Sequence, residues 1–313
     1  MGRAGWGRGR AAVTVEGKGS ERAGDRGRWG VRSLRVAAHC GRHLRNSLGV
    51  GCSVLLVLAG CRPRALDPQP RTILAVFAHP DDEIFVGPLL AHYARRGARV
   101  RLAIVTDGEK GASPRAGVPA GPELARVRAA EARCSCRELG IEAPELLGFK
   151  DGELGQLSNP PGGYLAEVVR VIRRLFVEIK PDVVITWGPE GGYGHADHRL
   201  VGAVVTQVVQ AGAKGSPSRL LFPGLPVDRV RLRPEGGYPH WAGTDPRFLT
   251  VRVPYDAADL AATRRALSCH RSQFPPEQME VLMSWLNETL AGRVYLRPWF
   301  GARATDDVFD GEP

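Results

Sequence analysis

The chain has 313 residues, of which 43% are hydrophobic and 24% are charged, enough apolar material for one large core or two small ones. Its net charge of +10 suggests binding to nucleic acid, but residues 1–66 hold 13 of the 43 Lys and Arg and only 3 of the 33 Asp and Glu. The remaining residues carry equal numbers of basic and acidic side chains, so they offer no basic excess for phosphates. We therefore predict no nucleic-acid partner.

The composition of residues 1–61 indicates a disordered basic segment followed by a secretory signal peptide. Residues 1–45 are rich in Gly and Arg and show no apolar periodicity. A basic stretch at 42–45 precedes an apolar run at 48–60 that is too short for a comfortable transmembrane helix. The run ends in Leu-Ala-Gly-Cys at 58–61, which resembles the lipobox of bacterial lipoproteins, where the Cys is lipid-modified and becomes the mature N-terminus.

We therefore predict an exported lipoprotein of a bacterial cell envelope, held at the membrane by a lipid on Cys61, with residues 62–70 as a linker. An uncleaved membrane anchor is the alternative. The long segment before the apolar run suggests a translation start downstream of Met1, although no internal Met offers one.

From residue 70 onward, predicted strands alternate with predicted helices. The strands are apolar runs at 72–78, 99–106, 145–149 and 182–187. The helices are expected at 84–96, 123–139 (ending before Gly140), 163–179 and 197–211. This alternation predicts an α/β fold with a Rossmann-like, doubly wound, mostly parallel sheet. Additional C-terminal elements are expected as strands at 220–222 and 248–253 and a helix at 256–271, within a domain at 71–300 and before a tail at 301–313.

Three cysteines lie within the predicted domain. Cys134 and Cys136 are two residues apart on a predicted helix and point in different directions, which disfavours a bridge between them. With Cys269 they form neither a disulfide framework nor a zinc knuckle. We predict that all three are small buried apolar residues.

Ionisable side chains follow two of the predicted strands. Ala-His-Pro-Asp-Asp-Glu at 78–83 follows the first strand, and His-Ala-Asp-His at 195–198 follows the strand at 182–187. In parallel sheets ligands bind beyond the carboxyl ends of the strands, so both clusters are expected at one edge of the sheet. Burying these groups is costly unless something pairs with them, and a divalent cation would pair with all of them. The sequence therefore predicts a metal site.

A dinucleotide site is the obvious competitor on this topology. Its fingerprint, G-x-G-x-x-G, would follow the first strand, where this chain has His-Pro-Asp-Asp-Glu instead. Those carboxylates would repel a diphosphate, and the glycine-rich loop at 188–194 has the wrong spacing. We predict no nucleotide cofactor.

The two clusters, in this order, resemble those of the PIG-L/LmbE-like zinc-dependent de-N-acetylases, which remove acetyl groups from N-acetylglucosamine-containing molecules. The resemblance extends over roughly residues 70–300. Its further matches are Thr-Asp-Gly-Glu at 106–109, Arg128-x-x-Glu131, Asp-Gly-Glu at 151–153, Trp-Gly-Pro-Glu-Gly at 187–191 and a closing segment at 270–273.

The resemblance implies that His79, Asp82 and His198 bind Zn²⁺ and that Asp81 is the general base. The physical interpretation agrees, since catalytic zinc takes three protein N or O ligands and leaves one position for water, whose pKa it lowers. After accepting a proton, Asp81 would deliver one to the departing amine.

The same resemblance assigns four further roles. His195 would stabilise the oxyanion as an imidazolium, and Asp197 would orient His195. Arg128 and Asp151 match positions that contact the sugar. The alternatives are more ordinary: the acids at 81–83 could only cap a helix, Arg128 and Glu131 could form a surface pair, and Trp187 is expected to pack rather than to carry a sugar.

The predicted function is a zinc-dependent hydrolase that deacetylates an N-acetylated sugar or glycolipid. The alternatives are a non-catalytic carbohydrate- or metal-binding envelope lipoprotein, and a zinc amidohydrolase with a non-sugar amide substrate. An intact Asp81 favours the enzyme, because a binding protein has no use for a base beside the metal. The sequence names neither the substrate nor the oligomeric state.

Overall fold

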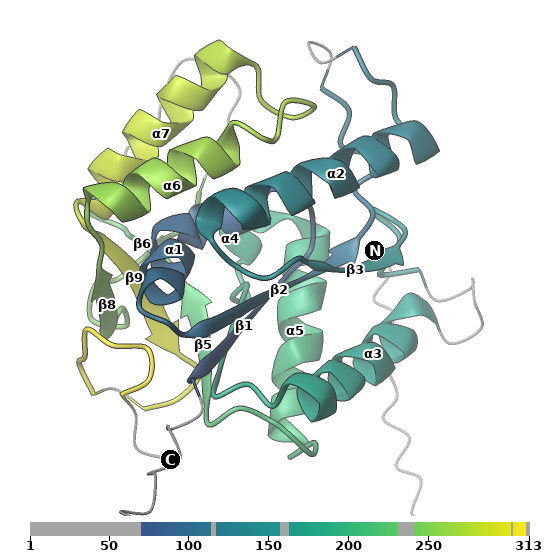
Figure 1. Ribbon diagram of the computed structural model, residues 1–313. Coiled ribbons are helices and arrows are strands. Elements are labelled where there is room, and N and C mark those ends of the chain that lie inside the picture. Colours follow the sequence, from purple (N-terminus) through teal and green to yellow (C-terminus); the bar gives the residue numbers. More distant parts are fainter. Residues whose placement is uncertain (1–69, 114–116, 157–162, 231–240, 302, 311–313) are drawn as a thin grey trace, which may run out of the picture. The chain divides into compact units, whose positions relative to one another are not determined.

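The structure is a computed structural model that describes residues 70–113, 117–156, 163–230, 241–301 and 303–310 (Figure 1). The predictions for residues 1–69, including the signal peptide and the lipid on Cys61, lie outside the described residues. Among the residues that are described, no helix is both long and apolar enough to cross a membrane.

A seven-stranded sheet forms the centre of the described domain, with the strand order β3-β2-β1-β4-β5-β9-β8. The strands are β1 (Thr72–Phe77), β2 (Arg99–Thr106), β3 (Glu145–Phe149), β4 (Val183–Thr186), β5 (Arg219–Pro223), β8 (Val251–Pro254) and β9 (Arg293–Pro298). The first five strands in this order are parallel, whereas β9 runs antiparallel to both β5 and β8. The predicted α/β class with a mostly parallel sheet and C-terminal additions is confirmed.

Helices cover both faces of this sheet (Figure 1). They are the 3₁₀-helix η1 (Asp82–Val86) and the α-helices α1 (Gly87–Arg95), α2 (Pro122–Leu139), α3 (Gly163–Ile179), α4 (Gly191–Gly194), α5 (Ala196–Gln210), α6 (Ala257–Leu267) and α7 (Pro276–Leu290). Alternate residues of β1 supply the two cores: Ile73 and Phe77 pack with α1, α2, α6 and α7, whereas Leu74 and Val76 pack with α3 and α5. Both faces of β1 are therefore buried, which explains its continuous apolar sequence.

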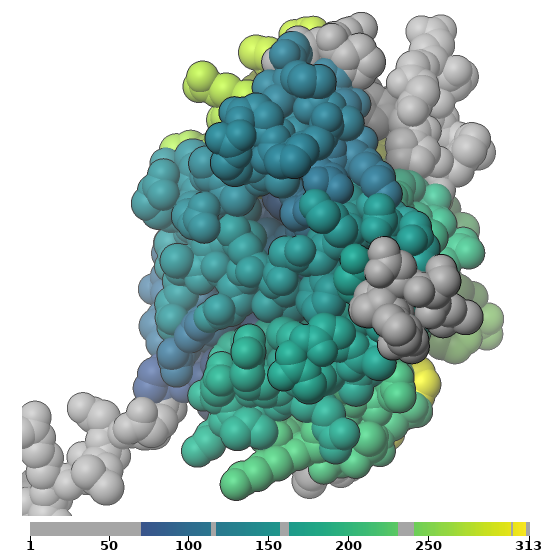
Figure 2. Space-filling model, turned by 90° about the vertical axis from the view of Figure 1, so that its right-hand side faces the viewer, coloured from purple at the N-terminus to yellow at the C-terminus, as the bar shows by residue number. Residues whose placement is uncertain are grey.

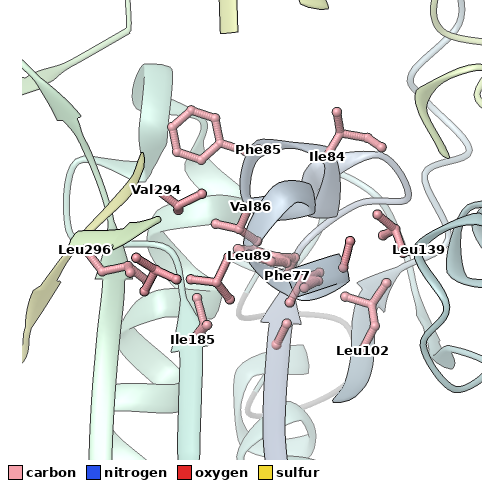
Figure 3. Packing of buried hydrophobic residues seen from close by; sticks show 14 of the residues in the cluster. Phe77, Ile84, Phe85, Val86, Leu89, Leu102, Leu139, Ile185, Val294 and Leu296 are labelled. Carbon is pink, nitrogen blue, oxygen red and sulfur yellow. The ribbon is translucent and has the colours of Figure 1, made fainter. Parts of the chain in front are cut away.

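Figure 3 shows the first of these cores from close by. Phe77 and Ile185 from the central strands lie beneath Val86 and Leu89, and Leu296 of β9 closes the same cluster. Figure 2 shows the domain from the side of β3, with blue residues around α2 above and green residues of the α3 region below. The packing of Phe77 in this core fixes the position of the carboxyl end of β1, and therefore the position of the residues that follow this strand.

Several element boundaries differ from the predictions. The helix predicted at 84–96 is divided into η1 and α1, because Pro88 stands at the beginning of α1, where a missing N–H is tolerated. Helix α7 and strand β9 had not been predicted, nor had the short pair β6 (Leu225–Pro226) and β7 (Gly243–Thr244). The domain limits stay a prediction; within the expected tail, Val308 is buried and its N–H donates to the Tyr93 hydroxyl at 2.8 Å.

The prediction for two of the cysteines was wrong. Cys134 on α2 and Cys269, just after α6, form a disulfide with 5.8 Å between their Cα atoms. Cys136 is buried and free, as predicted. The pairing depends on the packing of α2 against α6, which joins residues 135 positions apart and leaves no signal in the local sequence.

Candidate metal centre and catalytic site

Three residues from the two predicted clusters converge at the carboxyl end of the sheet. Because β1 and β4 are parallel neighbours, the segments that follow them meet. His79 Nδ1 lies 3.1 Å from His198 Nε2, His198 Nε2 lies 3.1 Å from Asp82 Oδ1, and His79 Nδ1 lies 3.8 Å from Asp82 Oδ2. Bonds of about 2.1 Å to a tetrahedral zinc ion place donors roughly 3.4 Å apart, so the distances from His198 Nε2 to His79 Nδ1 and to Asp82 Oδ1 suit such an ion.

The two carboxylate oxygens of Asp82 have different surroundings, and Oδ1 is the one that lies 3.1 Å from His198 Nε2. Its Oδ2 accepts hydrogen bonds from the backbone N–H groups of Ala78 (3.0 Å) and His79 (2.9 Å) and from the indole N–H of Trp187 (3.1 Å). Burial alone would raise the pKa of Asp82, but His198 and His79 together outweigh it and lower the pKa. Asp82 is therefore a carboxylate, the form that binds metals.

The outer ring nitrogens of both histidines are also engaged. His198 Nδ1 lies 3.2 Å from the carbonyl oxygen of Gly191, and its ring stacks on Trp187 with 4.5 Å between centroids. A proton on Nδ1 would be donated to that carbonyl, which leaves Nε2 free to bind a metal. Trp187 is only 1% exposed, so it packs in the core, as the sequence suggested. Its contacts with His198 and Asp82 also help to orient both side chains.

His79 is oriented by two buried carboxylates. Its Nε2 lies 3.1 Å from Asp151 Oδ1 and 3.4 Å from Asp197 Oδ2. Burial opposes protonation, but these two carboxylates and that of Asp82 outweigh it and raise the pKa of His79 to about 10. A metal-binding histidine that donates its other N–H to a carboxylate is the usual arrangement around catalytic zinc.

The sequence did not indicate that Asp151 and Asp197 would both contact His79. Both had been assigned elsewhere, Asp151 to the sugar and Asp197 to His195, and those roles stay predictions. Asp197 Oδ2 also accepts the backbone N–H of Gly152 at 2.8 Å. Two further groups of potential ligands share His79 with donor atoms within 4.8 Å of one another: His79 with His195 and His198, and His79 with Asp151 and Asp197.

Asp81, the predicted base, lies beside this centre in a strained conformation. Its φ angle of 112° lies in the left-handed region, which is costly for a residue other than glycine and is found mostly at functional sites. Its backbone N–H donates to Glu83 Oε2 at 3.0 Å. Burial raises the pKa of Asp81 to about 6, although the charge of Arg128 opposes the shift. A pKa close to neutral suits a general base.

Arg128 is the partner of Asp81 rather than of Glu131. Its guanidinium donates to Asp81 Oδ2 at 3.1 Å and to the carbonyl oxygen of Gly108 at 2.9 Å, and the residue is only 3% exposed. Glu131 instead accepts from the backbone N–H and the hydroxyl of Ser272, both at 2.7 Å. The alternative of a surface pair is therefore wrong, and contact of Arg128 with the sugar stays a prediction.

His195 caps the N-terminus of α5 and is half-buried. Its Nδ1 accepts the backbone N–H of Asp197 at 3.2 Å, so the N–H of the neutral ring is on Nε2. Burial, followed by the neighbouring His79 and His198, lowers the pKa of His195. We expected an imidazolium, but these surroundings favour a neutral ring whose Nε2–H remains available as a donor.

Glu83 was named in the sequence motif but given no role beyond helix capping. It is fully buried, and its Oε1 accepts from the Ser135 hydroxyl at 2.5 Å and lies 2.7 Å from His270 Nε2. Burial alone would raise the pKa of Glu83, but His270 outweighs it and lowers the pKa; the pKa of His270 is raised by Glu83 against the effect of burial. The two residues form a buried ion pair beneath Asp81.

A cavity of about 270 Å³ adjoins the centre and is lined by Asp81 and Asp82. Its other walls are mostly aromatic and aliphatic, and Phe85 stacks on Trp241 with 4.5 Å between centroids. Trp285 from α7 lies next to Trp241, at 5.8 Å. Ligand pockets are typically concave, mostly apolar and provided with a few polar groups, a description that this cavity fits.

Comparison with known proteins agrees with this geometry. The family model for GlcNAc-PI de-N-acetylases (PIG-L) matches residues 74–209, which include both clusters. A relative from Catenulispora acidiphila, a 1D-myo-inositol 2-acetamido-2-deoxy-alpha-D-glucopyranoside deacetylase, is 33% identical over 246 residues, 66% of this chain and 80% of the relative. The chain belongs to the PIG-L family. This relative and a second one, from Rhodococcus erythropolis, are both named as deacetylases.

Two further comparisons differ in extent. A deacetylase of the same name from Rhodococcus erythropolis is 38% identical over 159 residues, and this chain spans about half of it: 46% of this chain matches 54% of that one. The solved structure of N,N'-diacetylchitobiose deacetylase from Pyrococcus horikoshii shares the fold with a TM-score of 0.53, at 20% identity over 74% of this chain and 84% of that one.

Proposed function

We propose that this PIG-L protein is a zinc-dependent hydrolase that removes the acetyl group from an N-acetylglucosamine-containing substrate. The observation that carries the proposal is the convergence of His79, Asp82 and His198 beside Asp81, whose backbone is strained. The atoms of the three residues that face away from one another are held by hydrogen bonds. Zinc bound by these three residues would activate water and polarise the amide carbonyl. The names of the relatives support the choice of an acetylated glucosamine.

The residues around the centre fit the steps of amide hydrolysis. Asp81 would accept the proton of the attacking water, with Arg128 keeping its carboxylate in place through the 3.1 Å contact. His195 would donate its Nε2–H to the oxygen that becomes negative. Protonated Asp81 would then deliver the proton to the departing amine nitrogen, so that acetate and the free amine leave.

The aromatic lining of the cavity is relevant to the choice of substrate. Its aromatic walls could hold a sugar ring by stacking or an apolar group attached to the sugar. A non-sugar amide, or an acyl group larger than acetyl, is the second form of the hydrolase proposal. The binding-protein alternative is weaker, because the buried arginine and the strained backbone at Asp81 have no use in a protein that only binds metal.

The test measures amine release and metal content together. Purified protein is incubated with N-acetylglucosaminides that carry inositol, a second N-acetylglucosamine or an alkyl group. Asp81→Asn should keep its zinc yet lose about 10²–10⁴-fold in kcat, the usual contribution of a general base. His195→Ala should keep zinc and lose on the order of 10²-fold, as for one oxyanion donor. Asp245→Asn, at an exposed pair with Arg247, is the matched control.

Near wild-type turnover by Asp81→Asn would refute the proposed base. Zinc binding without amine release from any substrate would favour the binding protein.

We further propose that the protein is exported and held at the membrane by a lipid on Cys61, outside the described residues. The Cys134–Cys269 disulfide supports export, since disulfides persist mainly in oxidising compartments. A diacylglyceryl group plus an N-acyl chain would suffice for stable anchoring. In a bacterial host, palmitate label and membrane association should disappear in Cys61→Ser and persist in Cys52→Ser. An unlabelled cytosolic product that retains residues before Cys61 would contradict the proposal.

A further inference from the structure

The backbone N–H of Asp81 donates to a buried carboxylate, while its carbonyl oxygen accepts the N–H of Ile84 at 3.1 Å. Glu83 Oε2 accepts the Asp81 N–H at 3.0 Å, while Glu83 Oε1 is held by the Ser135 hydroxyl at 2.5 Å and by His270 Nε2 at 2.7 Å. Glu83, Ser135 and His270 are all fully buried. The Glu83 carboxylate thus supports the left-handed conformation of Asp81 and is itself positioned by Ser135 and His270. Arg128 supports the same segment from its other side, through the carbonyl oxygen of Pro80 at 2.5 Å and Asp81 Oδ2 at 3.1 Å.

Ser135 and His270, the two residues that hold the Glu83 carboxylate, each directly follow a cysteine of the disulfide. Cys134 precedes Ser135 on α2, and Cys269 precedes His270 after α6. The bond thus joins the two backbone segments that grip Glu83 from opposite elements. Both cysteines are partly exposed, so a reductant can reach the bond.

The disulfide is not the only connection between these elements. Helices α2 and α6 pack along their length, and Arg265 on α6 donates to Glu138 on α2 at 2.8 Å. We therefore expect the reduced protein to stay folded, with Ser135 and His270 less tightly fixed. A buried hydrogen-bond network that is only partly satisfied loses much of its rigidity.

We propose that the Cys134–Cys269 disulfide positions Asp81 through Ser135, His270 and Glu83, and that its reduction lowers turnover without releasing the metal. The turnover part rests on the proposed hydrolase function; the positioning part does not. Glu83 is a positioning residue here, since it touches the backbone of the base and none of the three proposed zinc ligands through its hydrogen bonds.

Reduction is best carried out with a phosphine, because a dithiol offers thiolates that compete for zinc. The phosphine gives two electrons to the S–S bond and becomes the phosphine oxide, with water supplying its oxygen and the two protons of the new thiols. Wild-type protein is compared before and after this treatment, with the phosphine removed.

Two measurements then test the two parts separately. Deuterium uptake of a peptide that contains Asp81 reports the hydrogen bond to Glu83 and should become faster on reduction. Turnover should fall several-fold in kcat with little change in KM and unchanged zinc content, as expected for a misplaced base rather than for lost substrate binding. Cys134→Ala/Cys269→Ala should behave like reduced protein with or without phosphine, whereas Cys136→Ala, at the free cysteine of α2, should respond like wild type.

Glu83→Gln shows whether the disulfide acts through Glu83. Removing an orienting partner of an active site typically costs about 10–100-fold in activity, so this variant should be slow and keep its zinc. If the disulfide acts through Glu83, reducing Glu83→Gln should cost little more, because the two perturbations then remove the same interaction.

Unchanged deuterium uptake at Asp81 after reduction would overturn the inference whether or not the protein is a hydrolase. Fully additive losses of turnover in Glu83→Gln would also overturn it and leave the disulfide as a plain covalent staple. If the oxidised protein releases amine from no substrate while uptake still responds to phosphine, the proposed function fails and the positioning role stands.

Discussion

The position of Asp197 distinguishes the candidate metal centre in the structure from the one predicted by resemblance. The structure places the Asp197 carboxylate on His79, at 3.4 Å, together with Asp151 at 3.1 Å. Loss of a carboxylate that orients a metal-binding histidine typically weakens metal binding by about 10–100-fold. Because the two carboxylates share one His79 N–H, Asp197→Asn or Asp151→Asn alone should cost about tenfold, and the double variant about 100-fold or roughly 2.7 kcal/mol.

Zinc affinity is measured by competition with a fluorescent chelator at fixed pH, with Asp245→Asn as the exposed control. If Asp197 instead served only His195, Asp197→Asn would bind zinc like wild type and lose only kcat. Wild-type affinity in both single variants and in the double variant would refute the assignment of these carboxylates to His79.

Three further outcomes are expected. His198→Ala should lose its zinc in elemental analysis, because two remaining ligands hold the ion poorly. His270→Gln should lower the free energy of unfolding by about 3–5 kcal/mol in urea titrations near pH 5.5, since it leaves the Glu83 carboxylate buried without a positive partner. The pKa of His270 is raised from 6.5 and that of Glu83 is lowered from 4.5, so this difference is fully present between pH 4.5 and pH 6.5. It shrinks as the pH rises through the folded pKa of His270 or falls through that of Glu83. Trp241→Ala should raise KM several-fold for alkyl N-acetylglucosaminides and leave zinc content unchanged, because it removes an aromatic wall of the cavity.

The sequence alone was enough to predict the parallel sheet and the meeting of two ionisable clusters at its edge. Buried parallel strands have continuous apolar runs, and the segments at 72–77 and 183–186 show them plainly. Since ligands bind beyond the carboxyl ends of such strands, the order of strands and clusters along the chain was sufficient to place His79 near His198.

The C-terminal third was predicted less well for a physical reason. Helix α7 and strand β9 were absent from the prediction, although Trp241 and α7 build the apolar wall of the cavity beside Asp81 and Asp82. Strand β9 is antiparallel to both of its neighbours, so it does not continue the alternation of strand and helix on which the prediction was based.

Only the tertiary structure decided which partner each ionisable group has. Asp151, Asp197 and His195 were all expected near the centre, but the pairing of the carboxylates with His79 depends on distances of a few ångströms between the segments after β1 and β3 and the first turn of α5. The Cys134–Cys269 bond depends on the packing of α2 against α6 in the same way. The sequence shows how apolar side chains repeat along a single helix or strand and how far apart motifs lie in the chain. How elements that are distant in the chain turn toward one another, and which of their side chains touch, is decided by the packing of the whole core.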